Sequence, residues 1–143
     1  MIRPDSRQRG ATSIELAILT PAVIAFFVAI VIAGRVTLAR QATDSAAYDA
    51  ARTASLARTA ATAQPSATSA ALTSFNSQGI TCTSLSVSVN TAGFFIEAGQ
   101  PATVTVTVTC IALLSDIALP GMPGSATLTS SFVSPLDRYR ERG

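Results

Sequence analysis

The longest apolar run of the chain follows a short N-terminal segment, residues 1–9, that carries arginines. The 19 residues from Leu16 to Gly34 contain no charge. A bilayer core of roughly 30 Å is crossed by about 20 apolar residues in a helix. The pattern therefore predicts the membrane-spanning part of a helix over residues 11–34. Glu15 stands at the start of this run, where a charge is costly unless it has a partner or lies at the membrane interface.

The helical pattern continues beyond this run as a stripe of small residues. Residues 35–63 contain neither Pro nor Gly. Alanine, which has the highest helix propensity, recurs there at spacings of three and four, so that one face carries small side chains. The alanines of this stripe are Ala39, Ala42, Ala46, Ala50, Ala54, Ala57 and Ala61. We therefore expect a single helix over residues 11–63, of which only the first third is apolar enough for lipid.

Proline and glycine mark the expected boundaries of the helices. Pro21 lies within the apolar run and should kink or weaken the helix there. Pro65 should end the long helix, after which Ser66 caps a short second helix over residues 67–78. Gly79 is suited to stop that second helix.

Alternating apolar and polar residues then predict β-strands. Residues 81–90, 102–110 and 125–134 alternate with period two and are rich in β-branched side chains. Residues 111–119 fit either a strand extension or a short helical turn. The expected fold class is α+β, with a small antiparallel sheet of three or four strands packed with the short helix. One sheet face would carry Leu85, Val87, Val89, Val104, Val106, Val108, Leu128 and Phe132.

The two cysteines, Cys82 and Cys110, are expected to form a disulfide if this part of the chain lies outside the cytoplasm, and two buried thiols if it does not. Pairing Val87 with Val104 brings the apolar side chains to one face. That register directs Cys82 away from Cys110. One β-bulge near the end of the strand would bring the two sulfurs together, and we therefore expect a disulfide.

Composition narrows the function. All ten basic residues are Arg, and Lys, His and Trp are absent; without residues 1–10, seven Arg face seven Asp and Glu. No basic run supports nucleic-acid binding. A serine or cysteine nucleophile would lack His or Lys as base, and Glu97 and Asp116 are isolated acids. Metal-ligand spacings and phosphate-binding glycine loops are also missing, so we expect a non-enzyme without a cofactor.

The informative motif lies at the start of the apolar run, where Arg7-Gln8-Arg9-Gly10 is followed by Ala11-Thr12-Ser13-Ile14-Glu15. Cleavage after Gly10 would give Ala11 a free amine and make Glu15 the fifth residue. In a bundle of such helices, this carboxylate could pair with the Ala11 amine of a neighbour and fix the axial register.

This arrangement resembles the class III signal of type IV pilins and pseudopilins. More closely, the chain resembles TadE-like minor pilins of the tight-adherence pilus system. The resemblance rests on RGATSIELAILTPAV, SAAYDAARTAS, VTVTVTC and LPGMPGSATLTSS. It implies cleavage by the prepilin peptidase between Gly10 and Ala11, assembly through Glu15, and a role in the biogenesis or priming of a thin adhesive pilus. Leu16 departs from the family, in which an aromatic residue often follows the Glu.

The implied partners are the prepilin peptidase, other pilin or pseudopilin subunits through the N-terminal helix, and the membrane. The expected location is the cytoplasmic membrane, crossed once with the N-terminus inside and the C-terminal domain outside. The expected organisation is a leader over 1–10, a membrane segment over 11–34, a helix extension over 35–63, an α+β domain over 66–134 and a polar, solvated tail over 135–143.

The residues are also compatible with two other functions. Cleavage after Ala33 would release a secreted binding module of residues 34–143. An uncleaved single-pass anchor could instead carry a small domain that binds a solute or a partner. The three hypotheses predict different mature N-termini. Phe94, Phe95 and Ile96 either pack on the short helix or form a contact patch.

Overall fold

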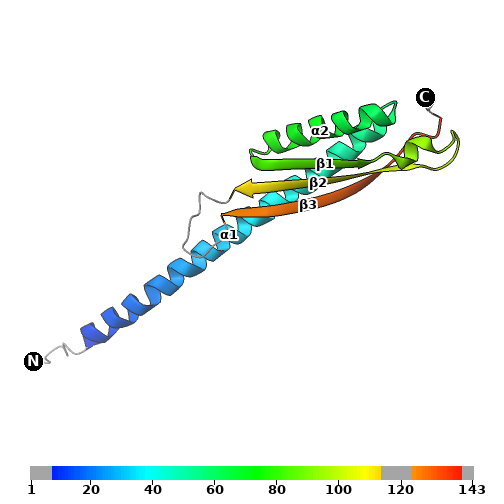
Figure 1. The fold of residues 1–143 in the computed structure, drawn as a ribbon. Coiled ribbons are helices and arrows are strands. Elements are labelled where there is room, and N and C mark those ends of the chain that lie inside the picture. The colour runs from blue at the N-terminus through cyan, green and yellow to red at the C-terminus, as the bar shows by residue number, and fades with distance from the viewer. Residues whose placement is uncertain (1–7, 114–123, 140–143) are drawn as a thin grey trace, which may run out of the picture. The chain divides into compact units, whose positions relative to one another are not determined.

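The computed structural model describes residues 8–113 and 124–139, with side chains from residue 14 onward. The elements follow one another as α1 (Gln8–Leu56), α2 (Ala60–Ser77), β1 (Cys82–Asn90), the 3-10 turn η1 (Ala92–Phe95), β2 (Thr103–Leu113) and β3 (Ser125–Pro135) (Figure 1). The expected α+β class is confirmed. The chain forms two compact units, one up to Val36 and one from Thr37 onward, and each is described by itself.

The first unit is the apolar part of α1. This helix is long and apolar enough to cross a membrane, and none of its most apolar stretch is buried in the protein. Pro21 lies inside the continuous helix. The side-chain hydroxyl of Thr20, the residue before it, donates to the Leu16 carbonyl at 2.6 Å. The described part of this unit therefore presents apolar side chains on all sides and has no core of its own.

The second unit begins with the alanine stripe, whose first five members lie in α1. Six of the seven predicted alanines, Ala39 to Ala57, are buried, which confirms the stripe. The single helix over 11–63 is wrong, because α1 ends at Leu56 and α2 begins at Ala60. Ala61, the seventh alanine, lies in α2 and is exposed.

The start of α2 differs from the prediction at Ser66 because threonines provide a cap seven residues earlier. The Thr59 hydroxyl accepts from the Thr62 amide, and the Thr62 hydroxyl accepts from the Thr59 amide, which forms a capping box. Pro65 lies inside α2. It deprives the carbonyl of Ala61 of its helical donor, and this turn is exposed, so that water can replace the lost bond. Gly79, with φ of +67°, follows the C-cap, as expected.

The described strands form one antiparallel sheet in the order β1-β2-β3. The register of the first pair is wrong in the prediction: Val87 pairs with Val108, and Val104 pairs with none of the β1 residues. The two registers differ by four positions. Because side chains alternate with period two, both place the same valines on one face. The turn decides between them, since Gly93 in η1 lies directly on the backbone of Thr103.

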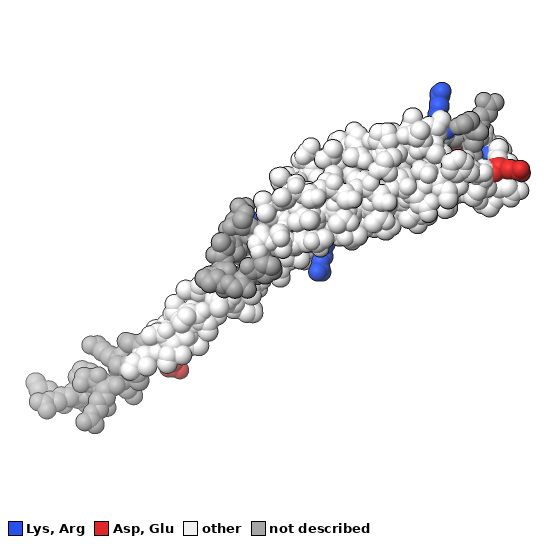
Figure 2. Space-filling view, viewed as in Figure 1, with Lys and Arg blue, Asp and Glu red and all other residues white. Residues whose placement is uncertain are grey.

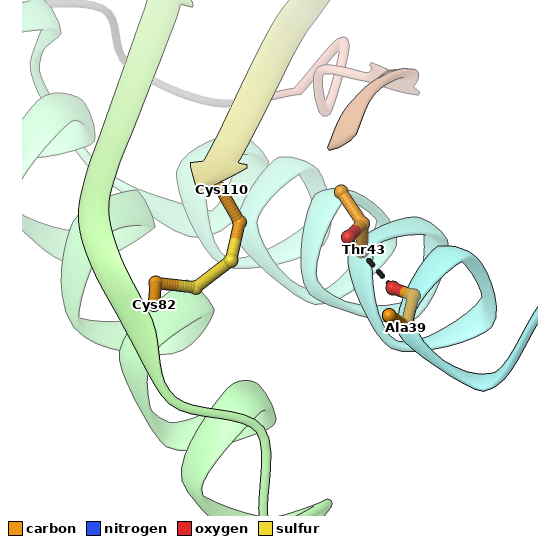
Figure 3. The surroundings of a disulfide bond; sticks show 4 residues. All are labelled: Ala39, Thr43, Cys82 and Cys110. Atoms are coloured by element: carbon orange, nitrogen blue, oxygen red, sulfur yellow. Dashed lines mark hydrogen bonds between the residues drawn. A yellow bond between two sulfur atoms is a disulfide. The ribbon is translucent and has the colours of Figure 1, made fainter. Parts of the chain in front are cut away.

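The disulfide between Cys82 and Cys110 is confirmed, and so is the bulge that it requires. Cys82 pairs with Ala112 and Ser84 with Ile111, so that Thr83 is the extra residue. The bulge turns Cys82 to the face that carries Leu85. Figure 3 shows the disulfide beside the turn of α1 that contains Ala39 and Thr43.

The apolar face of the sheet and the two helices form the core of the second unit. Side chains of α1, α2 and the strands belong to one buried cluster. Val104, Val106 and Val108 of the central strand are fully buried. On β3, by contrast, Phe132 remains 41% exposed and packs edge-on against Tyr48 of α1, with ring centroids 4.9 Å apart. The predicted apolar face is therefore correct, and its cover is thinnest over β3.

The opposite face of the sheet carries mostly hydroxyl side chains, together with Ile111, Leu113 and Val133. Thr107 bonds to Ser131 and Thr109 to Thr129 across β2 and β3, at 3.1 Å each. The whole of α2 and all three strands lack charged residues. In Figure 2 the surface over these elements is accordingly white.

Part of the predicted solvated tail over 135–143 is held by the fold. Leu136 is buried, and its amide donates to the Ala102 carbonyl at 2.9 Å. The Gly99 amide donates to the Arg138 carbonyl at 2.9 Å. The prediction is therefore wrong for Leu136, whereas the side chains of Asp137, Arg138 and Tyr139 are exposed as expected. Residues 140–143, like Asp116 and most of the ambiguous segment 111–119, lie outside the described residues; β2 extends through Leu113.

Candidate functional site

The candidate assembly site lies at the start of α1. The backbone of Gly10 and Ala11 is helical, and the helix begins before them, at Gln8. Glu15 follows Ala11 by four residues, so that both lie on the same helix face, about 6 Å apart along the axis. The Glu15 side chain is exposed. The structure thus places this carboxylate on the outside of a helix, where a neighbouring helix can reach it.

The surroundings of Glu15 are apolar. The next charged residue along the helix is Arg35. The intervening side chains include exposed large apolar residues on every side of the helix. They are Leu16, Ile18, Leu19, Val23, Ile24, Phe26, Phe27, Ile30 and Val31. A carboxylate at the head of such a surface loses hydration when lipid or other helices cover it, and a cationic partner would offset that cost.

Two grooves in the second unit are lined in part by residues of η1. The larger one, of about 540 Å³, is lined in part by Asn90, Thr105 and Arg138. The second, of about 350 Å³, is lined by Arg58, Ala60, Glu97 and the turn 94–98. Both are open to solvent, and within the described residues no three His, Cys, Asp or Glu side chains group as metal ligands. The grooves carry no arrangement of acid, base and nucleophile.

The two interpretations given for Phe94, Phe95 and Ile96 apply to different residues of this turn. Phe94 is buried and lines the same groove as Ala60, the first residue of α2, whereas Phe95 is 80% exposed. Phe94 thus belongs to the buried core cluster, which also contains Ala67, Ala71 and Phe75 of α2. Only Phe95 and the partly exposed Ile96 project as a surface patch.

Two residues that join distant elements of the second unit, Gln64 and Gly93, carry no signal in the sequence. The Gln64 side chain bonds to the backbone of β1, donating to the Val87 carbonyl at 2.6 Å and accepting from the Val89 amide at 3.1 Å. Gly93 permits the close approach of η1 to Thr103. Neither contact follows from a local pattern, because each joins segments that are distant along the chain.

Comparison with known proteins bears on the N-terminal helix. A family model described as TadE-like protein matches residues 10–52, which include Gly10, Ala11, Glu15 and most of the alanine stripe. No curated protein and no solved structure matches the chain. The chain is therefore similar to TadE-like protein over residues 10–52, the segment that forms nearly all of α1.

Proposed function

We propose that the chain is a minor pilin or pseudopilin that contributes to the assembly or priming of a tight-adherence type IV pilus. One observation carries the proposal: the TadE-like match includes an exposed apolar run, Leu16 to Gly34, that is preceded directly by the carboxylate of Glu15. The match supports an association with the pilus system, and the carboxylate supports assembly through the helix.

The proposed location follows from the helix and the disulfide together. The apolar part of α1 would lie in the cytoplasmic membrane, with the N-terminus inside. Disulfides persist in oxidising compartments and are rare in the cytosol. The Cys82–Cys110 bond therefore favours an extracytoplasmic position for the second unit.

The proposed mechanism of assembly uses the two groups at the head of α1. Prepilin peptidase would cut after Gly10 and leave Ala11 with a free amine. The positive charge of this amine would pair with the Glu15 carboxylate of a neighbouring subunit. Each charge would then have a partner when the helices are surrounded by lipid or by other apolar helices. Ion pairs of this kind fix register, because a shifted helix leaves both charges unpaired.

The mature N-terminus tests this proposal. In a host with the prepilin peptidase, Edman or mass-spectrometric sequencing should find Ala11 first. Gly10→Val should abolish cleavage, because a bulky side chain replaces the small residue at the cut, and the full-length chain should accumulate. Gly34→Val, at a position whose Cβ would meet nothing within 4 Å, is the matched control and should be cleaved normally.

The other functions give different results in the same experiment. A mature chain that begins at Gly34 would identify a secreted module and contradict the proposal. An intact Met1 in the peptidase-competent host would identify an uncleaved anchor and contradict it equally.

The role of Glu15 is tested by Glu15→Gln. We expect normal cleavage and membrane insertion but a drop of at least tenfold in subunit–subunit crosslinking, because the neutral amide no longer offsets the desolvation of the neighbour's amine. Asp44→Asn, which neutralises an exposed carboxylate on the same helix, should leave crosslinking unchanged. Equal crosslinking in the two variants would refute the proposed pair.

A further inference from the structure

β1 is an outer strand of the sheet, and its own residues do not protect it. The sheet has the order β1-β2-β3, so that among the described residues β1 has a neighbouring strand on one side only. Outer strands readily pair with other chains, and proteins prevent this with charges, proline, bulges or cover. β1 contains neither a charge nor a proline, and its bulge lies at the start, between Cys82 and Ser84. The regular part, residues 85–90, therefore needs cover from elsewhere in the fold.

Gln64 of α2 provides this cover. Figure 1 shows α2 alongside β1. The Gln64 side chain donates to the Val87 carbonyl at 2.6 Å and accepts from the Val89 amide at 3.1 Å. A side-chain amide has an acceptor oxygen and an NH2 donor, as a peptide group has a carbonyl and an N–H. Gln64 thus forms with β1 the two bonds that one residue of a fourth strand would form.

The position of these bonds determines how much of the edge is closed. In an antiparallel pair, every second residue of a strand directs its backbone groups to the neighbouring strand. Because Val87 and Val89 bond to Gln64, the outward residues of the regular part are Leu85, Val87 and Val89. Leu85 lines a small groove together with Phe75 of α2. An incoming strand would therefore meet the Gln64 side chain at two of its three contact points on β1.

The packing of α2 holds Gln64 at this edge. Ala63, directly before it, and Ala67, three residues after it, are fully buried. The hydroxyl of Thr68 donates to the Gln64 carbonyl at 3.0 Å. The Gln64 side chain itself is exposed, so that water can replace its bonds to β1 when they are lost. The contact should therefore add little to stability, and its larger effect is on the strands with which β1 can pair.

The opposite edge of the sheet has no comparable cover among the described residues. There, β3 forms hydrogen bonds with β2 alone, and its 11 residues contain no charge. An open β3 edge on one copy and an open β1 edge on another could pair without repulsion. Each joint sheet would again expose one β1 edge and one β3 edge, so that pairing would continue into a filament. Closure of one edge is sufficient to stop this growth.

We propose that Gln64 blocks the β1 edge: its side chain takes the place of a fourth strand and prevents the sheets of two copies of this chain from joining, β1 of one copy to β3 of the other. The block is built into the second unit and does not depend on the proposed pilin function. Copies of the chain that meet at high concentration would otherwise pair through their sheets.

Crosslinking between copies tests the proposal. p-Benzoylphenylalanine replaces Ser131, on the hydroxyl face of β3, in the full-length chain purified in detergent. Adducts of two copies are isolated by gel electrophoresis and mapped by mass spectrometry. We expect Gln64→Ala to raise the yield of β3–β1 adducts at least tenfold over the parent. Gln78→Ala, the matched control, removes a side chain that bonds to Ser74 of α2 and should leave the yield unchanged. Equal yields in Gln64→Ala and the parent would overturn the proposal.

A second substitution at the same position separates an open edge from a damaged fold. Gln64→Lys also loses the two bonds to β1, but it places a charge beside the edge, and charged side chains, lysine above all, protect edge strands. The lysine variant should therefore give no more β3–β1 adduct than the parent. Both variants should unfold within about 10 °C of the parent. A lysine variant that crosslinks as strongly as the alanine variant would contradict the proposal, because the charge would then have failed to protect an open edge.

Hydrogen exchange measures the block on single copies of the chain. In dilute Gln64→Ala, the Val89 amide should exchange at least tenfold faster than in the parent, because it loses its acceptor, while the amides of β2 keep their rates. An unchanged Val89 rate would show that Gln64 does not cover the edge and would overturn the proposal. None of these measurements depends on cleavage after Gly10, so that this proposal and the proposed pilin function fail separately.

Discussion

Removing the Cys82–Cys110 disulfide is expected to lower the free energy of unfolding of the second unit by about 3 to 4 kcal/mol. The bond closes a loop with a sequence separation of 28, and the chain-entropy relation assigns roughly this energy to such a loop. The effect is large for a unit whose core contains many alanines, because each alanine buries little apolar area. Thermal unfolding of Cys82→Ala/Cys110→Ala in detergent, followed by circular dichroism, should show a midpoint lower by roughly 15 °C.

Two controls separate the crosslink from the loss of the sulfur atoms. The parent chain, reduced and kept reduced during the scan, should shift nearly as far as the double variant. Thr81→Ala, at an exposed position next to the bulge, should leave the midpoint nearly unchanged. A reduced parent that melts with the oxidised one would show that the disulfide does not stabilise the second unit.

Gly93→Ala is expected to destabilise the second unit by about 3 kcal/mol. An added Cβ would lie 2.1 Å from the Thr103 carbonyl oxygen and 3.1 Å from Cδ1 of Leu136. The oxygen belongs to the backbone and cannot rotate away, so η1 must move from the start of β2. Denaturant unfolding of the full chain in detergent should show a correspondingly lower midpoint.

The matched control for this substitution is Gly124→Ala. Its added Cβ would meet nothing within 4 Å, and its φ is not positive. Alanine there should be neutral or stabilise slightly, since it restricts the unfolded chain. If the two variants unfold at the same midpoint, the contact between Gly93 and Thr103 does not fix the loop.

The elements that depend on local periodicity could be predicted from the sequence. The alanine stripe, the alternating strands and the stop at Gly79 each carry a repeating or single-residue signal, and the structure confirms them. The end of α1 at Leu56 carries no such signal, because residues 57–59 contain neither Pro nor Gly. A threonine pair decides it instead, through a capping box that lacks the usual glutamate.

The features that depend on contacts between distant segments could not be predicted. Hydrophobic periodicity cannot distinguish strand registers that differ by an even number of positions, because both place the same side chains on one face. The burial of Leu136 depends on Ala102 and Gly93 and not on its polar neighbours. Of the candidate site, the sequence identified Gly10, Ala11 and Glu15; the structure adds that Glu15 is exposed on a helix, and the pairing remains a prediction for the experiments above.

The absence of charge from α2 and from all three strands has a consequence for the environment in which the second unit works. Dissolved ions weaken contacts between exposed charges, with a screening length of about 8 Å at physiological ionic strength. A surface without charges gives these ions little to screen. Contacts formed through this sheet should therefore be little weakened by electrostatic screening, in contrast to contacts through the charged residues of the same unit, such as Arg58 and Glu97.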